Sequence, residues 1–257
     1  MEMGRTDRYQ VSIGRHRYSY NHAHDLLGMI EIEVLDCYKS RKLPVGCTVV
    51  DIGAGVGDFA LVASGLVGPS GKVVAIEPDE EDYECLLSNI ESNHCRNIIP
   101  IHTAVSDRDE EVLLSFKGRS RRCRARRLRD VLAELAIDSR SIRFVKIDIE
   151  GWERTVVPDN LGILSQCDRV AIELHDGTDV VIHPLMEQLG FFFRRISRQE
   201  YMRSTVLFVL NHPVQSLRIY RAARRAEAFH GLGRFLHGLD IASSGNLIVG
   251  EYVRREL

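Results

Sequence analysis

The sequence predicts an α/β protein with a doubly wound, mainly parallel sheet of seven strands that ends in an antiparallel hairpin. Three observations lead to this fold. Apolar runs of strand length alternate with segments of helical periodicity along most of the 257 residues. A glycine-rich turn joins one early run to a helix, and the last two apolar runs are separated by a loop too short for a crossover.

The elements are expected in the following order. An N-terminal arm precedes a helix over Asp25–Tyr38. Five strands follow, at Val49–Ile52, Lys72–Ile76, Ile98–His102, Ile142–Ile149 and Val170–Leu174, with a shorter one at Val112–Phe116. Helices are expected at Phe59–Leu66, Asp79–Ser92 and Leu128–Leu135. Their apolar residues recur with the spacing of one helix face, and glycine or proline interrupts the pattern between elements.

The chain end carries the predicted hairpin. Its strands are Phe191–Ile196 and Thr205–Leu210, joined by the polar loop Ser197–Ser204. A basic helix from His212 and an extended tail over Asn246–Val253 complete the chain. We therefore divide it into an arm and helix over residues 1–46, a cofactor-binding domain over 47–211 and a basic helix and tail over 212–257.

Composition is typical of a water-soluble enzyme. With 44% hydrophobic and 27% charged residues, the chain can bury a full core. Its net charge of −2 gives no general attraction to polyanions. No apolar run has the length of a signal peptide or a membrane span, so we expect a cytoplasmic protein. The six cysteines show neither paired nor zinc-binding spacing.

The turn after the first expected strand indicates a bound cofactor. Gly53, Ala54, Gly55 and Gly57 allow a sharp bend and close approach of a ligand to the backbone. Asp51 precedes them, and a carboxylate there would repel the pyrophosphate of a dinucleotide. S-adenosylmethionine carries a sulfonium and an ammonium instead of phosphate. The acid therefore favours this methyl donor.

A second acid supports the same cofactor. Glu77 and Pro78 follow the next strand, about 20 residues beyond the glycines, where a carboxylate can bind a ribose diol. An acid at a strand end is also common as a solvated turn residue or a helix cap. The combination of strand, glycine turn, helix and acid favours cofactor binding.

Polar residues at the ends of the later strands are the catalytic candidates. Lys146, Asp148 and Glu150 share one face of their strand, so Asp148 and Glu150 are expected to face the reaction. A structural ion pair between Lys146 and Glu173 is an alternative that leaves a catalytic Asp148 possible. His175 ends the neighbouring strand, and either it or Asp148 can act as general base. A divalent ion held by Asp148, Glu150 or His175 is an open alternative, but their spacing is not a recognised metal-binding signature, and no metal ligand is predicted.

The order of these motifs resembles that of FkbM-type methyltransferases. The resemblance covers roughly Thr48–Phe193 and is most specific in the segment from Lys146 to Glu153. It implies a class I, Rossmann-like methyltransferase that uses S-adenosylmethionine to methylate hydroxyls of sugars or secondary metabolites. It also implies that Ser106 and Asp107, or the backbone at Ala104 and Val105, lie beside the adenine.

The chain departs from the family pattern in a basic insert. The insert contains Arg119, Arg121, Arg122, Arg124, Arg126 and Arg127, and the C-terminal helix adds Arg218, Arg221, Arg224 and Arg225. Such a run is either a solvated loop or a site for a polyanion such as a phosphorylated glycan, a lipid headgroup or RNA. An RNA or protein methyltransferase is thus an alternative to a small-molecule or glycan enzyme, and a non-catalytic binding module is a third hypothesis.

Overall fold

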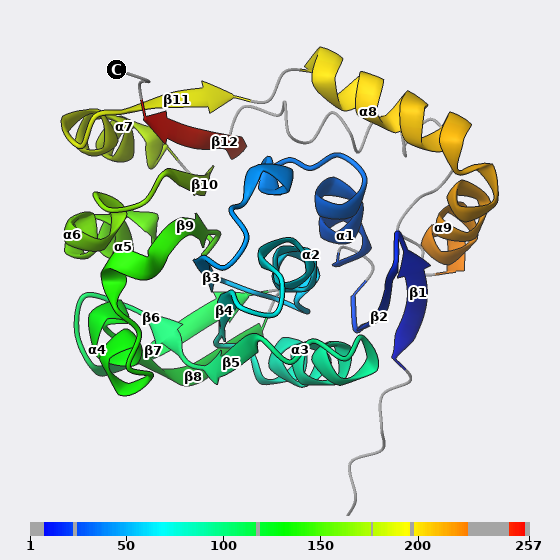
Figure 1. The fold of residues 1–257 in the computed structure, drawn as a ribbon. Coiled ribbons are helices and arrows are strands. Elements are labelled where there is room, and N and C mark those ends of the chain that lie inside the picture. The colour runs from blue at the N-terminus through cyan, green and yellow to red at the C-terminus, as the bar shows by residue number, and fades with distance from the viewer. Residues whose placement is uncertain are drawn as a thin grey trace, which may run out of the picture.

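A seven-stranded sheet with helices on both faces forms the centre of the protein (Figure 1). The computed structural model describes residues 8–22, 25–116, 119–175, 177–195, 198–225 and 247–254. The strand order is β11-β12-β10-β9-β3-β4-β5. These strands are β3 (Thr48–Ile52), β4 (Lys72–Glu77), β5 (Ile98–His102), β9 (Ile142–Ile147), β10 (Arg169–His175), β11 (Phe191–Arg195) and β12 (Leu247–Arg254).

Six of these strands run in one direction, and β12 runs against its neighbours β10 and β11. The predicted mainly parallel sheet of seven strands is therefore confirmed. The chain builds β3, β4 and β5 outward and then returns to place β9 on the other side of β3. At such a reversal the loops on either side diverge, which leaves a crevice at the carboxyl ends of the strands.

Two helical layers cover the sheet. Helices α1 (Asp25–Glu33), α2 (Asp58–Val67) and α3 (Glu80–Ser92) pack on one face. The other face is covered by α4 (Leu128–Glu134), α5 (Glu153–Asp159), α6 (Leu161–Leu164) and α7 (Asp179–Gln188). Neighbouring residues of one strand point into opposite layers, as Val49 and Val50 do. The apolar strands are thus buried on both sides, as expected for a parallel sheet.

The last strand of the chain is antiparallel to its neighbours, as predicted, but the predicted residues do not form it. Residues 205–210 belong to helix α8 (Arg198–Asn211), which is followed by α9 (Pro213–Arg225). The reversed strand is β12, which the sequence indicated only as an extended tail. A short apolar run fits a helix or a strand equally well, so its pattern alone did not distinguish them.

The N-terminal arm folds onto the helical layer. Strands β1 (Tyr9–Ile13) and β2 (His16–Tyr20) form an antiparallel hairpin. The side chain of Asn89 on α3 accepts a hydrogen bond from the backbone N–H of Ser19 and donates one to its carbonyl oxygen, at 2.7 and 2.9 Å. This pairing satisfies both backbone groups, so the arm is held as an extra strand pair beside α3.

The basic insert forms a strand. Strands β6 (Ala104–Val105), β7 (Glu110–Phe116) and β8 (Arg119–Arg126) make a small sheet in the order β6-β8-β7. The expectation of a solvated loop for this run is therefore wrong. Alternation along β8 places Arg121, Cys123 and Ala125 toward a cavity, whereas Arg122 and Arg124 are mostly exposed to solvent.

Within the described ranges, no helix is both long enough and apolar enough to cross a bilayer.

Candidate functional site

The glycine turn after β3 lies beside a cavity. Gly53, Gly55 and Gly57 have φ angles of 78°, 52° and 90°, in the region that favours glycine. A Cβ on Gly53 would lie 1.8 Å from the carbonyl oxygen of Asp148. On Gly55 it would meet no heavy atom of the described chain within 4 Å, and Gly55 lines the cavity. Gly53 is thus required by packing, whereas Gly55 leaves space for a ligand.

The cavity has a volume of about 470 Å³ and opens at the carboxyl ends of β3, β4, β9 and β10. Volumes of this size are typical of small-molecule sites. Seven predicted cofactor residues line it, namely Gly53, Ala54, Gly55, Glu77, Pro78, Ala104 and Val105. All three predicted catalytic residues, Asp148, Glu150 and His175, line it as well. The other four predicted cofactor residues, Asp51, Gly57, Ser106 and Asp107, lie outside this lining.

Glu77 joins the end of β4 to the glycine turn. Its Oε2 accepts a hydrogen bond from the N–H of Gly55 at 2.7 Å, and its Oε1 accepts one from the N–H of Asp79 at 2.8 Å. Burial raises the pKa of Glu77 to about 8, although both backbone bonds act in the opposite direction. Each oxygen keeps one further acceptor position, so the carboxylate can still bind hydroxyl donors.

Asp51 is fully buried behind the cavity and faces Lys146. The Nζ of Lys146 lies 3.2 Å from Oδ1 of Asp51 and 3.4 Å from Oδ2 of Asp148, and it donates a hydrogen bond of 2.7 Å to the carbonyl of Gly53. The contact with Asp51 is an ion pair, because neither oxygen of Asp51 has an aligned hydrogen-bond partner. The positive charge beside Asp51 is therefore that of Lys146, where the sequence predicted the methyl donor. Lys146 pairs with Asp51 and Asp148, and not with Glu173 as the alternative interpretation had it.

Lys146 and Asp51 change each other's pKa values. Burial tends to lower the pKa of Lys146, but Asp51 and Asp148 outweigh it and raise that pKa above its ordinary value. Burial raises the pKa of Asp51 to about 6, and Lys146 opposes this rise. The ammonium is thus held in its charged form between two carboxylates.

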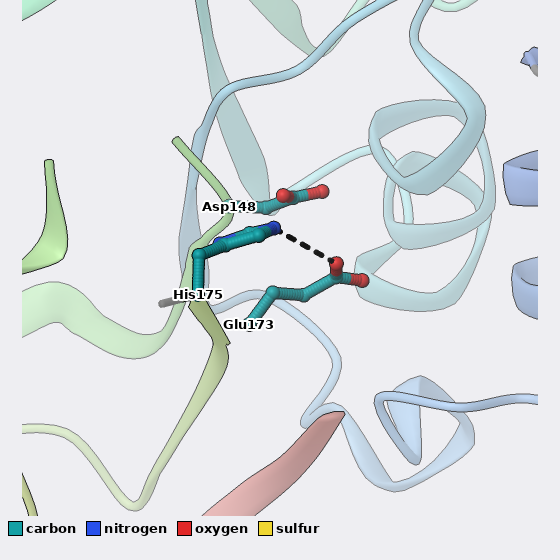
Figure 2. Close-up of side chains that lie close together, drawn as sticks. All are labelled: Asp148, Glu173 and His175. Atoms are coloured by element: carbon teal, nitrogen blue, oxygen red, sulfur yellow. Dashed lines mark ion pairs between the residues drawn. The ribbon is translucent and has the colours of Figure 1, made fainter. Parts of the chain in front are cut away.

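His175 is oriented by a buried carboxylate. Its Nδ1 lies 2.9 Å from Oε1 of Glu153, a residue with no solvent exposure. Its Nε2 lies 3.6 Å from Oε2 of Glu150 and 3.9 Å from Oε2 of Glu173. Burial would lower the pKa of His175, yet the bond from Glu153 and the nearby acids raise it to about 9. The ring therefore presents Nε2 to a group of carboxylates (Figure 2).

Glu150 differs from the strand residues beside it. It follows the end of β9 with a φ of 52°, and its side chain is 55% exposed. The strand alternation that predicted its direction ends at Ile147, so its contact with His175 arises from the turn.

Several acids that line the cavity were missed as site residues, among them Glu173, Glu31 and Asp58. Glu173 accepts a hydrogen bond from the hydroxyl of Tyr38, and burial together with Asp148 raises its pKa well above the ordinary range. Glu31 lines the same cavity, and burial raises its pKa to about 7. Glu31 lies one helical turn after Leu27, another lining residue, so helix spacing contained a signal for it.

Ser106 and Asp107 support the small sheet. The N–H of Ser106 donates to the carbonyl of Arg126 at 2.9 Å, and its hydroxyl lies 3.2 Å from Oδ1 of Asp107. Arg127 donates a hydrogen bond to the carbonyl of Asp107. These bonds fix the start of α4 against β6, one step removed from the cavity wall.

The small sheet supplies an apolar wall to the cavity. Val112, Leu114, Cys123 and Ala125 line it from β7 and β8, and Trp152 packs against the same cluster. Such a surface suits the face of an adenine ring, which buries apolar area on stacking.

The outward arginines of β8 are matched with acids. Arg122 lies 4.0 Å from Glu111, and Arg124 lies 2.8 Å from Asp109. Arg126 pairs with Glu134. Arg121, on the cavity side, lies 2.5 Å from Glu81. The local charge of the insert is consequently much lower than its sequence indicated.

Fold and site together define the class of protein. A crevice at the reversal of strand order, a glycine turn open to a cavity and a buried acid at the end of the next strand form the arrangement in which open α/β sheets bind nucleoside cofactors. A model of the methyltransferase FkbM domain matches residues 51–193, more than half of the chain. The protein belongs to the FkbM methyltransferase family, and its cofactor is S-adenosylmethionine.

Other similarities are more distant. A probable cobalt-precorrin-6B C(15)-methyltransferase (decarboxylating) from Sulfurisphaera tokodaii is 35% identical over 96 residues, which is 36% of this chain and 50% of that protein. The chain thus spans half the length of this curated relative. Among solved structures, M. jannaschii TYW2 in complex with AdoMet has 15% identity and a TM-score of 0.45, covering 77% of this chain and 82% of that one. The M. jannaschii tRNA m1G37 methyltransferase has 13% identity and a TM-score of 0.47, covering 100% and 60%.

Proposed function

We propose that the protein is an O-methyltransferase whose acceptor is a hydroxyl of a small molecule or glycan. The observation that carries this proposal is a single cavity lined both by the glycine turn with Glu77 and by Asp148, Glu173 and His175. S-adenosylmethionine, when bound, supplies an electrophilic methyl group on sulfur. The carboxylates supply hydrogen-bond acceptors and a destination for the proton of the acceptor, and the imidazole positions the acceptor oxygen.

At the donor end, the residues fit the cofactor. Gly55 leaves space for it, and Glu77 keeps acceptor positions for ribose hydroxyls. We assign the apolar wall of β7 and β8, together with Val105, to the adenine ring. Asp51 acts indirectly, because its charge holds Lys146 against the carbonyl of Gly53.

At the acceptor end, Asp148 is assigned as the proton acceptor. Its side chain is 28% exposed and lines the cavity, whereas Lys146 contacts one of its oxygens. The acceptor hydroxyl gives its proton to this carboxylate as the oxygen–methyl bond forms and the methyl–sulfur bond breaks. His175, held by Glu153, orients the acceptor oxygen from the side of β10.

A neutral hydroxyl suits this site better than a polyanion does. Glu31, Asp58, Asp148, Glu150 and Glu173 all line the cavity and would repel phosphate groups. The outward arginines of β8, which could have docked RNA, already contact acids. Binding to a generic single-stranded RNA should therefore be weak at 0.15 M salt; tight binding that falls steeply with salt would favour the RNA alternative.

Substitution at the acceptor end tests the proposal. We expect Asp148→Asn and His175→Ala to lower turnover by about 10²- to 10⁴-fold, because each removes a group in contact with the acceptor. The affinity for S-adenosylhomocysteine, measured by calorimetry, should stay within about twofold of wild type, since donor contacts remain. Turnover is measured by methyl transfer from labelled donor to a panel of monosaccharides and hydroxylated aromatics.

Glu111→Gln is the matched control, because Glu111 is 76% exposed and lies on the outer side of the small sheet. It should leave both turnover and donor affinity unchanged. Equal losses of donor affinity and turnover in Asp148→Asn and His175→Ala would contradict their assignment to the acceptor. Absence of donor binding by the wild-type protein would overturn the whole proposal.

A further inference from the structure

Asp148, Glu173 and His175 bring three metal-ligand atoms together at the cavity. Each of these described residues offers one ligand atom, a histidine nitrogen or a carboxylate oxygen, and the three atoms lie within 4.8 Å of one another. Figure 2 shows the imidazole between the two carboxylates, with the polar ends of the three side chains turned toward a common volume. A mixed nitrogen and oxygen set of this kind is suited to a divalent transition-metal ion.

The backbone fixes this arrangement. β9 and β10 are parallel neighbours in which Ile147 pairs with Ile172. One residue further, Asp148 follows β9 while Glu173 continues β10. Glu173 and His175 are two residues apart on β10 and therefore share one face. An acid follows one strand, and an acid and a histidine lie two residues apart on the neighbouring strand. This pattern thus brings three metal-ligand atoms together.

The separation between His175 and Glu173 is compatible with one ion. Two ligand atoms bonded to the same metal at about 2.1 Å cannot be more than about 4.2 Å apart. The Nε2 of His175 and Oε2 of Glu173 are 3.9 Å apart, inside that limit. They are too far apart for a hydrogen bond between them and form an ion pair at this distance.

Each prospective ligand has an outer partner that leaves its inner atom available. Glu153 contacts Nδ1 of His175, which leaves Nε2 toward the carboxylates. Tyr38 donates to Oε1 of Glu173 and leaves Oε2. Lys146 lies beside Oδ2 of Asp148. A histidine whose second nitrogen is bound by a buried carboxylate is the usual outer arrangement of metal-binding histidines.

The surrounding charge also calls for a cation. Glu31 lines the same cavity, and its carboxylate makes no hydrogen bond or ion pair with the other described residues. Asp58 lines it as well. This is an observation independent of the three ligands, because Glu31 comes from α1 and Asp58 from the start of α2. A divalent ion would compensate carboxylates that Lys146 alone cannot balance.

We propose that Nε2 of His175, Oε2 of Glu173 and an oxygen of Asp148 form a site for a divalent cation such as Mn²⁺. The three protein ligands leave coordination positions open to the cavity. The role of the ion rests on the proposed O-methylation, whereas the existence of the site does not. The ion would bind the acceptor hydroxyl and favour loss of its proton. Asp148 would then hold the ion through one oxygen and still receive the proton of the acceptor, while His175 would orient the acceptor through the ion.

Metal binding is tested on the full-length protein after treatment with a chelator and its removal. We expect one Mn²⁺ per chain, measured by the loss of free Mn²⁺ signal in electron paramagnetic resonance. Glu173→Gln and His175→Ala should each weaken this binding at least tenfold, because each removes one of three ligands. Glu111→Gln, on the exposed face of the small sheet, should bind Mn²⁺ as wild type does.

Calorimetry with S-adenosylhomocysteine on the same samples separates the two proposals. Donor binding without stoichiometric Mn²⁺ binding, or Mn²⁺ binding that survives both substitutions, overturns the metal site and leaves the methyltransferase proposal intact. Mn²⁺ binding without any donor binding overturns the proposed function and leaves the site. Retained donor binding in Glu173→Gln and His175→Ala shows that a loss of Mn²⁺ is not a loss of folding.

Discussion

Glu77 is a buried acid whose charge state controls a predicted donor contact. Burial raises its pKa to about 8, and the charge of Asp82 adds to the rise. Below that pH the carboxyl carries a proton and is a poorer acceptor for ribose hydroxyls. We therefore expect the affinity for S-adenosylhomocysteine to increase by up to about tenfold per unit between pH 6 and 8, and to level off above. Calorimetry across this range measures the effect.

Asp58 and Glu31 also titrate in this range, since burial raises both of their pKa values to about 7. The difference between wild type and Glu77→Gln isolates the effect of Glu77 on donor affinity; parallel pH profiles for the two proteins would exclude Glu77 as the source.

The raised pKa of Glu77 also affects the stability of the fold. Because the folded pKa lies above the unfolded value, the contribution of Glu77 to the free energy of unfolding is full below about pH 4.5 and is lost as the pH rises through about 8.

Gly53 and Gly55 have similar backbone angles and different surroundings, so they form a matched pair. Gly53→Ala places a Cβ 1.8 Å from a backbone oxygen, and we expect it to destabilise the fold by about 3 kcal/mol or more. Gly55→Ala meets only open space and should cost about 1–2 kcal/mol of backbone strain while weakening donor binding. Urea unfolding and donor calorimetry distinguish the two; equal stability losses would contradict this assignment.

At the scale of elements, β12 completes the sheet from the far end of the chain. Tyr252 is fully buried and its hydroxyl lies 2.6 Å from Nδ1 of His183, while Glu251 pairs with Arg169 at 3.0 Å. We expect a chain that ends at residue 246 to lose cooperative thermal unfolding, because β10 and β11 lose the strand between them. Circular dichroism on heating measures this.

Tyr252→Phe is the control for the truncation, since it keeps the ring and removes only the hydroxyl. It should unfold cooperatively, with a stability loss of about 1 kcal/mol. A truncated chain as stable as Tyr252→Phe would show that β12 is dispensable.

Elements with a strong local pattern were predicted well, and those that depend on distant pairing were not. The strands β3, β4, β9 and β10 are largely apolar on both faces, and β3 and β4 also follow glycine or proline breaks, so their positions were evident. By contrast, β8 consists largely of arginines and becomes a strand only because β7 and β6 pair with it. Residues 205–210 have strand-like composition, yet they continue a helix that begins at Arg198.

At the scale of the whole molecule, the sequence located the site and misjudged some of its contacts. Strand order brings Glu77, Asp148 and His175 to one cavity, and this followed from their positions at strand ends. The partner of Lys146 did not follow, because Asp51 and Glu173 both lie on strands adjacent to β9. Only side-chain direction, which sequence spacing does not contain, decides between such neighbours.

The hydrogen bond from Lys146 to the carbonyl of Gly53 links the two ends of the cavity. One ammonium contacts both the glycine turn and Asp148, so the two ends of the cavity share a single charge. Removal of this ammonium would therefore disturb both ends at once. The wall formed by β7 and β8 lines the cavity without sharing these contacts, so a change there would alter the surface assigned to the adenine ring and leave the charge balance around Lys146 intact.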